Sequence, residues 1–192
     1  WSSSAASDVY KRQILNNELG GKISIPLLEE DTIAIDLNFI NINNIDNNNG
    51  SRSAFLNLYN ELSFEMIFRT KSIVYNSRDY GSWSFTLTKD DQSLIMDNLM
   101  GIYGKWGLTY NADEVSRLII SREGLGWKTS LDSRAYSGSP EKAFKQIGIE
   151  PNFEMDTFSM DVSVNWPSLP WEVDYGNTVS YTHLTLPTTT IV

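Results

Sequence analysis

Apolar and polar residues alternate most clearly in two stretches of this chain, residues 33–39 and residues 158–166. A period of two places successive side chains on opposite faces of a β-strand, so both stretches are predicted to be half-buried strands. The apolar positions are Ile33, Ile35, Leu37 and Phe39 in the first, and Phe158, Met160, Val162, Val164 and Trp166 in the second.

Shorter apolar runs predict further strands at residues 64–69, 72–75, 82–87 and 127–131. Apolar residues at helical spacing predict a short helix over residues 55–62. The pair Asn49-Gly50 predicts a turn before it, because both residue types tolerate a positive φ.

Three more helices are expected between residues 88 and 148. Thr88 is an N-cap candidate for the first, whose apolar positions Ile95, Leu99, Ile102 and Trp106 fall on one helical face. The second spans about residues 111–124, with Gly124 as its end, and the third begins at Ser139-Pro140 and ends before Gly148. The predicted fold class is therefore α+β, a mostly antiparallel sheet covered by two or three helices.

Residues 23–37 and 147–162 resemble each other in sequence. An internal duplication would explain the likeness and would make the fold pseudo-symmetric, whereas the alternative is a chance match between two amphipathic strands. If the duplication is real, both strands lie in one sheet and direct their apolar residues towards the same helical layer. Asp36 and Asp161 then lie on the opposite, solvated face.

The two ends of the chain have an unusual relationship. Residues 7–13 can be back-translated to a DNA sequence whose reverse complement, read in another frame, encodes residues 179–185. Both segments resemble the translated transposon end of sequencing adapters; a natural low-complexity tail is the alternative. We therefore expect residues 1–13 and 178–192 to be non-native flanks that contribute little to the core, and residues 14–177 to form one globular domain, possibly truncated.

Composition narrows the chemistry. The chain has 192 residues, a net charge of −9 and no cysteine, and its one histidine, His183, lies in the C-terminal flank. Catalysis through thiol or imidazole groups is therefore not expected within residues 14–177, and neither is a cofactor or a transition-metal site. The acidic balance disfavours nucleic-acid binding, and no apolar run approaches the roughly 18 residues of a membrane span.

Two groups of candidate site residues remain. Asp36 and Asp161 are candidates for a carboxylate site, which would act in acid–base chemistry or hold a divalent cation. Trp166, Trp171 and Glu172 are candidates for a carbohydrate-binding surface. With no catalytic residues identified, the favoured function is a non-enzymatic protein-interaction or assembly module with an unknown protein partner. The alternative is a carbohydrate-binding or carbohydrate-active module.

Overall fold

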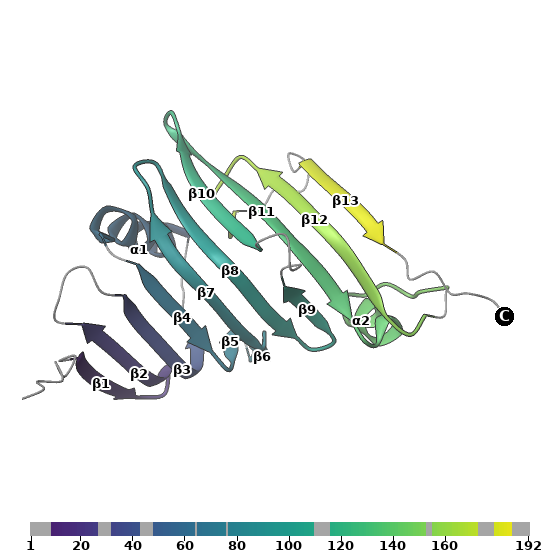
Figure 1. The fold of residues 1–192 in the computed structure, drawn as a ribbon, viewed down its shortest axis with the longest axis horizontal. Helices are drawn as coiled ribbons and strands as arrows, with labels where there is room; N and C mark the ends of the chain where they lie inside the picture. The colour runs from purple at the N-terminus through teal and green to yellow at the C-terminus, as the bar shows by residue number, and fades with distance from the viewer. Residues whose placement is uncertain are drawn as a thin grey trace, which may run out of the picture.

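The computed structural model describes residues 9–26, 32–42, 48–63, 65–75, 77–109, 116–152, 155–172 and 179–185. These residues form one large, twisted β-sheet with two helices beside it (Figure 1). The α+β prediction with two or three covering helices is therefore wrong, because strands occupy most of the stretch that was expected to be helical.

The described part of the chain contains the following elements. The helices are α1 (Asn48–Glu61) and α2 (Pro140–Gln146). The strands are β1 (Val9–Leu15), β2 (Leu19–Pro26), β3 (Ile33–Ile42), β4 (Met66–Thr70), β5 (Ile73–Tyr75), β6 (Arg78–Asp79), β7 (Ser82–Lys89), β8 (Ser93–Tyr103), β9 (Trp106–Thr109), β10 (Arg117–Glu123), β11 (Gly126–Ser137), β12 (Phe158–Trp166) and β13 (Val179–Thr185).

The strand order across the sheet is β1-β2-β3-β4-β7-β8-β10-β11-β12-β13. The short strand β9 pairs with both β8 and β11, as β10 does further along these strands. Strand β5 pairs with β3 and β6. Strand β3 runs parallel to β4 and β5, and all the other pairs are antiparallel. A parallel pair requires a crossover connection, and α1 lies in the segment that connects β3 to β4.

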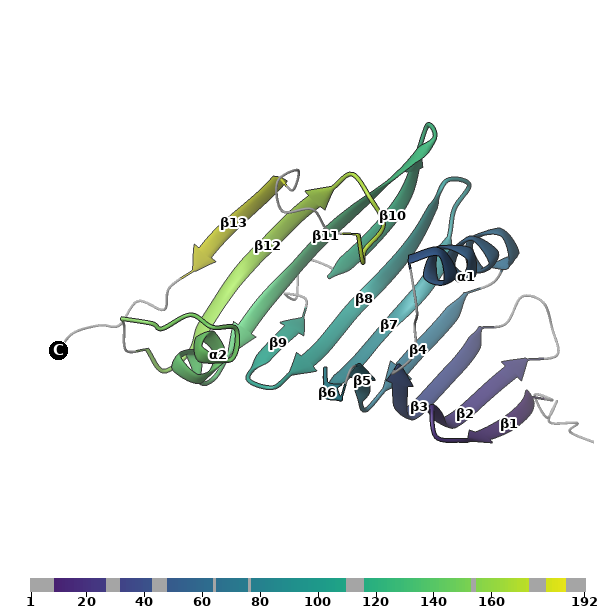
Figure 2. The same cartoon turned by 180° about the vertical axis from the view of Figure 1, so that it is seen from behind.

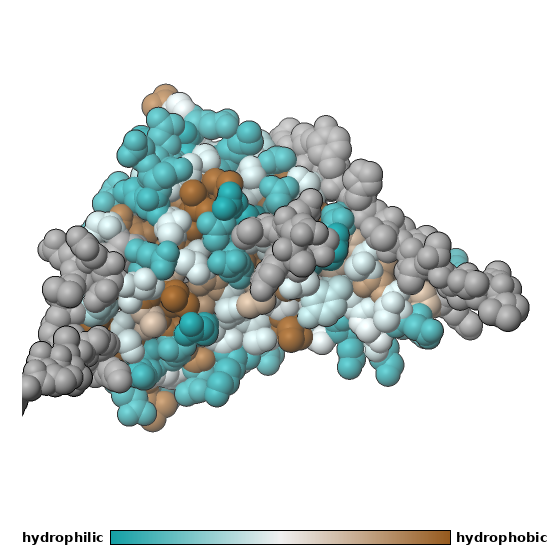
Figure 3. Space-filling view, in the orientation of Figure 1, coloured by the Kyte–Doolittle hydropathy of each residue, from teal (hydrophilic) through white to brown (hydrophobic). Residues whose placement is uncertain are grey.

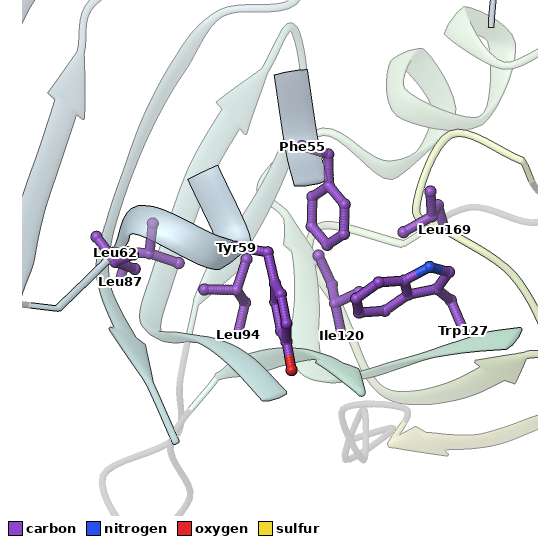
Figure 4. Close-up of a cluster of buried hydrophobic side chains, with 8 residues drawn as sticks. All are labelled: Phe55, Tyr59, Leu62, Leu87, Leu94, Ile120, Trp127 and Leu169. Atoms are coloured by element: carbon purple, nitrogen blue, oxygen red, sulfur yellow. The ribbon is translucent and has the colours of Figure 1, made fainter. Parts of the chain in front are cut away.

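Both helices lie on the same face of the sheet, which is turned towards the viewer in Figure 2. Phe55 and Tyr59 of α1, and Leu62 just after its end, are buried against side chains of the central strands (Figure 4). The strand and loop members of this core cluster are Leu87, Leu94, Ile120, Trp127 and Leu169. Phe55 and Tyr59 each meet the Trp127 ring edge to face, with ring centroids 5.0 Å apart. The core therefore lies between α1 and the middle of the sheet.

Helix α2 packs on the same face at the other end of the sheet. Phe144 of α2 meets Trp106 and Phe158, with ring centroids 5.2 Å apart in both contacts. The Trp106 Nε1 group donates a hydrogen bond of 2.8 Å to the backbone oxygen of Ala143. The prediction of a short helix after Ser139, with Pro140 at its first position, is confirmed, although the Ser139 side chain makes no capping hydrogen bond.

Residues 88–106 form strands and not the predicted helix. A β-bulge interrupts the pairing of β7 with β8, and Asn98 has a φ of 54° there. The inward positions of β8 are therefore Leu94 and Met96 before the bulge and Leu99 after it. The interval of three residues from Met96 to Leu99 resembles the spacing of apolar residues on one face of a helix. Two residues after the N-cap candidate Thr88, Asp90 lies in a hairpin turn, where its Oδ1 accepts hydrogen bonds from the backbone of Gln92 and Ser93.

Two further local predictions are corrected. Residues 117–123 form β10, and Gly124, with a φ of 60°, belongs to the hairpin turn that leads to β11. The expected start of that helix, residues 111–115, lies outside the described residues. The Asn49-Gly50 turn is also wrong, because these residues belong to the first turn of α1. The strands predicted at 33–39, 82–87, 127–131 and 158–166, and the helix at 55–62, are confirmed.

The two amphipathic strands lie in the same sheet, as β3 and β12. Leu37 of β3 and Phe158 of β12 are both buried on the helix-covered side. Their surroundings differ, however, because β3 is parallel to β4 whereas β12 is antiparallel to both of its neighbours. The local pairing therefore does not repeat in the way that a duplicated unit would.

The adapter-like segments lie at the two edges of the sheet. Residues 9–15 form β1 at one edge, and residues 179–185 form β13 at the other. Within the described residues, β1 pairs only with β2 and β13 pairs only with β12. Within the part of the chain that the structure describes, no helix combines the length and the apolar character needed to cross a membrane.

Candidate functional site

The face of the sheet opposite the helices, here called the open face, carries a row of side chains that crosses six strands. The register pairs Gln13 with Lys22, Lys22 with Asp36, Asp36 with Arg69, Arg69 with Ser84, and Ser84 with Met100. Paired residues of neighbouring strands point to the same side of a sheet, so the six side chains share one face. This face is turned towards the viewer in Figure 1 and Figure 3, and its surface mixes polar and apolar residues.

The first four residues of this row line a depression with a volume of about 760 Å³, here called the cationic depression. Its charged side chains are Lys22, Asp36, Arg69 and Lys71, which gives three cations to one carboxylate. Asp36 pairs with Arg69 at 2.8 Å. The depression is therefore locally positive, although the chain as a whole carries a net charge of −9.

A second depression of about 310 Å³, here called the apolar depression, adjoins the first, and Arg69 and Thr70 line both. Met100, Ile102 and Tyr136 contribute its large side chains. Ile102 is 54% exposed, and Met100 and Tyr136 beside it are 40% and 38% exposed. The two depressions therefore lie side by side, here together called the hollow, and their lining changes from cationic to apolar across the sheet.

Glycine at position 107 sets the position of the Tyr136 ring. Gly107 lies opposite Tyr136 in the pairing of β9 with β11, and a Cβ atom on Gly107 would overlap the tyrosine ring. The ring therefore lies over the backbone of β9, at the wall of the apolar depression. A flat aromatic surface held in this way is suited to contact with a ligand's apolar side chain.

Three arginine–aspartate pairs span neighbouring strands on the open face. Arg69 pairs with Asp36, Arg117 with Asp97, and Arg134 with Asp161. Only the first pair lines the hollow. All six side chains remain partly exposed, so these pairs are solvated structural contacts of modest strength.

The structure does not bring the two carboxylate candidates together. Asp36 on β3 and Asp161 on β12 are separated by six strand-to-strand steps. At about 4.8 Å per step they lie roughly 29 Å apart, well beyond the roughly 5–10 Å of a catalytic carboxylate pair. Each is paired with an arginine instead. The described residues contain no group of three or more His, Cys, Asp or Glu side chains that could hold a metal ion.

The sugar-binding candidates also do not form one surface. The Trp166 side chain is buried, 7% exposed, and its Nε1 group donates to the backbone oxygen of Leu169 at 3.0 Å. Trp171 is 44% exposed and packs against Phe55, with ring centroids 5.6 Å apart. Glu172 lies 4.0 Å from Arg52 of α1. These three residues therefore lie on the helix-covered side, and they do not present a pair of exposed indoles.

Sequence reasoning missed Lys22, Arg69, Met100 and Tyr136, which the open face brings together. Each lies on a different strand, so only the order and register of the strands make them neighbours. The alternation of polar and apolar residues around Asp36 did indicate that its side chain faces away from the helices, and the structure places it there. No protein-family model, curated protein or solved structure matches this chain.

Proposed function

We propose that this chain is a protein-interaction module and that the open face of its sheet binds the partner. The observation that carries the proposal is the hollow formed by the adjoining cationic and apolar depressions. Both helices pack on the opposite face, so the open face is free of any described segment. Met100, Ile102 and Tyr136 are exposed side by side on this face, and exposed apolar side chains that gather together are typical of interaction surfaces.

The shape of the hollow favours a protein over a small molecule. Small-molecule sites bury most of their ligand's surface, whereas both depressions here are partly open to solvent. Arginine, methionine and tyrosine are enriched in protein interfaces, and the hollow contains one of each at Arg69, Met100 and Tyr136. The absence of a close carboxylate pair and the buried Trp166 leave the carbohydrate alternative with less support.

Selection of binders from a random peptide library tests this proposal. Ser84 lies between Arg69 and Met100 in the register, so Ser84→Trp places a bulky ring where the two depressions meet. We expect the selected peptides to lose binding to Ser84→Trp and to keep it with Leu125→Ser, which changes an exposed hairpin tip. Peptides that bind both variants equally well would show that the open face is not the interaction surface.

A further inference from the structure

We infer that the partner's bound segment is an extended peptide that carries acidic residues followed, a few positions later, by an apolar residue. This inference rests on the proposed function. The acidic part contacts Lys22, Arg69 and Lys71 in the cationic depression, and the apolar part contacts Met100, Ile102 and Tyr136 in the apolar depression.

Charge complementarity identifies the acidic part. Among the described residues, Lys22 and Lys71 have no ion-pair partner, and Arg69 uses one guanidinium nitrogen for its contact with Asp36. All three cations are exposed, so their remaining hydrogen-bond donors face solvent. Carboxylates are the protein groups that match such donors, and arginine binds them through its planar fork. The negative charge on the rest of the chain repels acidic ligands elsewhere, which confines their binding to this local patch.

The spacing of the strands sets the pattern of the peptide. Lys22 and Arg69 are two strand steps apart, and so are Arg69 and Met100. Two steps of about 4.8 Å correspond to roughly three residues of extended chain at about 3.3 Å each. A peptide that crosses the strands along this row therefore places an apolar residue about three positions from the acidic residue that contacts Arg69.

The apolar depression supplies the anchor at the other end. Its apolar side chains already lie exposed, and the Tyr136 ring is held over Gly107. Burial of one apolar side chain there removes surface of both partners from water without rearrangement of the sheet. Acidic residues alone would leave this part of the hollow exposed, so the structure favours a segment with both features.

The test uses a fluorescein-labelled nonapeptide with three glutamates, a two-serine spacer, a phenylalanine and a leucine, flanked by glycines. Its binding is measured by anisotropy. One control peptide has glutamine for each glutamate, and a second has serine for both apolar residues. We expect the double variant Lys22→Gln/Arg69→Gln to raise the Kd about tenfold, in line with the loss of two charge-assisted contacts. Arg117→Gln is the matched control, because Arg117 has the same aspartate pairing on the same face but lines neither depression.

Gly107→Ala tests the apolar half separately, because its new methyl group displaces the end of the Tyr136 side chain. This change should weaken binding of the labelled nonapeptide, here called the parent peptide, several-fold. Binding of the control peptide with serine for both apolar residues should not change. If the double cation variant affects folding, Lys71→Gln provides a milder test at the same depression.

The outcomes separate this inference from the proposed function. Failure of the parent peptide to bind more tightly than its glutamine version overturns the inference, and so does tighter binding of an acidic oligosaccharide to the same residues. If library-selected peptides still depend on Ser84 but lack acidic residues, the interaction surface stands and only the peptide chemistry is wrong. If the parent peptide binds equally well to the open-face variants, both proposals fail.

Discussion

Arg134 on β11 binds both carboxylate oxygens of Asp161 on β12, from Nε to Oδ1 at 2.6 Å and from Nη2 to Oδ2 at 2.9 Å. The second expected carboxylate, Asp36, receives one bond of 2.8 Å from Arg69. Both aspartates therefore lie on the open face and pair with an arginine of a neighbouring strand, but the two pairs differ in geometry. Two-point contact fixes both side chains, so the Arg134–Asp161 pair should contribute more to stability.

Replacement of each aspartate by asparagine tests this difference. We expect Asp161→Asn to lower the free energy of unfolding by about 1 kcal/mol and Asp36→Asn by about 0.5 kcal/mol or less, because both pairs are solvent-screened. Urea denaturation measures both. A loss of several kcal/mol for Asp161→Asn would show that the pair behaves as a buried one.

Gly81 has a backbone requirement that no other residue type meets. Its φ is 75°, and a Cβ atom would overlap the backbone oxygen of Ile102 on the neighbouring strand. Gly81→Ala should therefore lower the free energy of unfolding by more than about 2 kcal/mol, because it adds the strain of a positive φ to the displacement of the neighbouring backbone. Gly124→Ala is the matched control, since its φ is 60° but nothing lies within 4 Å of its Cβ position. Gly124→Ala should lower the free energy of unfolding by only about 1 kcal/mol, the strain of the left-handed backbone alone. Equal losses in thermal or urea unfolding would contradict the steric account.

Leu169 is predicted to behave as a core residue although it lies in a loop. It is 0% exposed in the cluster with Trp127 and Phe55, and Thr129 donates a hydrogen bond of 2.6 Å to the backbone of the adjacent Ser168. Leu169→Ala should lower the free energy of unfolding by about 2–4 kcal/mol through lost burial and a residual cavity. Leu125→Ala, at a side chain that is 100% exposed, should change it by less than about 0.5 kcal/mol. A small effect at Leu169 would mean that the loop is not packed on the core.

The sequence carried enough information for uninterrupted strands but not for interrupted ones. Strand β12 keeps a period of two throughout, and β3 keeps it from Ile33 to Leu37, where its pairing is regular, so the exposed faces of these stretches follow from the pattern. Strand β8 contains a bulge at Asn98, which shifts the inward positions by one residue and produces a spacing that helices also show. A bulge depends on the pairing between strands, and a local pattern does not contain that information.

The same limit applies to the candidate site. The position of Asp36 on a polar strand face could be predicted from its neighbours in the sequence. The proximity of Asp36 to Arg69 depends on the parallel pairing of β3 with β4. The proximity of Arg69 to Met100 depends on the order of β4, β7 and β8. The carboxylate and indole candidates were chosen by residue type. The hollow on the open face is instead a product of topology.

Deletion of the adapter-like flanks tests whether the edge strands matter to the fold. Among the described strands, β1 and β13 lie at the two edges of the sheet, and each pairs with one neighbour. We expect removal of residues 1–13 and 178–192 to leave cooperative unfolding intact and to shift the thermal midpoint by only a few degrees, in keeping with about 1 kcal/mol for a domain of this size. Loss of a cooperative transition in calorimetry would show that the flanks belong to the fold.

Glu141 and Lys145 form an ion pair one turn apart on α2, with 2.6 Å between Nζ and Oε1. The hydrogen bond and charge of Lys145 lower the pKa of Glu141 below 4.5, and those of Glu141 raise the pKa of Lys145 above 10.5. Because the folded pKa of Glu141 is the lower one, its stabilising contribution is present above the unfolded pKa of about 4.3 and is lost as the pH falls through the folded value.

An NMR titration of the Glu141 carboxyl carbon should therefore give a midpoint below 4.5. Lys145→Gln should raise that midpoint towards its ordinary value, and Lys142→Gln should raise it less, because the charge of Lys142 is the smallest of the causes. Equal effects of the two lysine variants would show that general positive charge, and not the specific contact with Lys145, sets the pKa of Glu141.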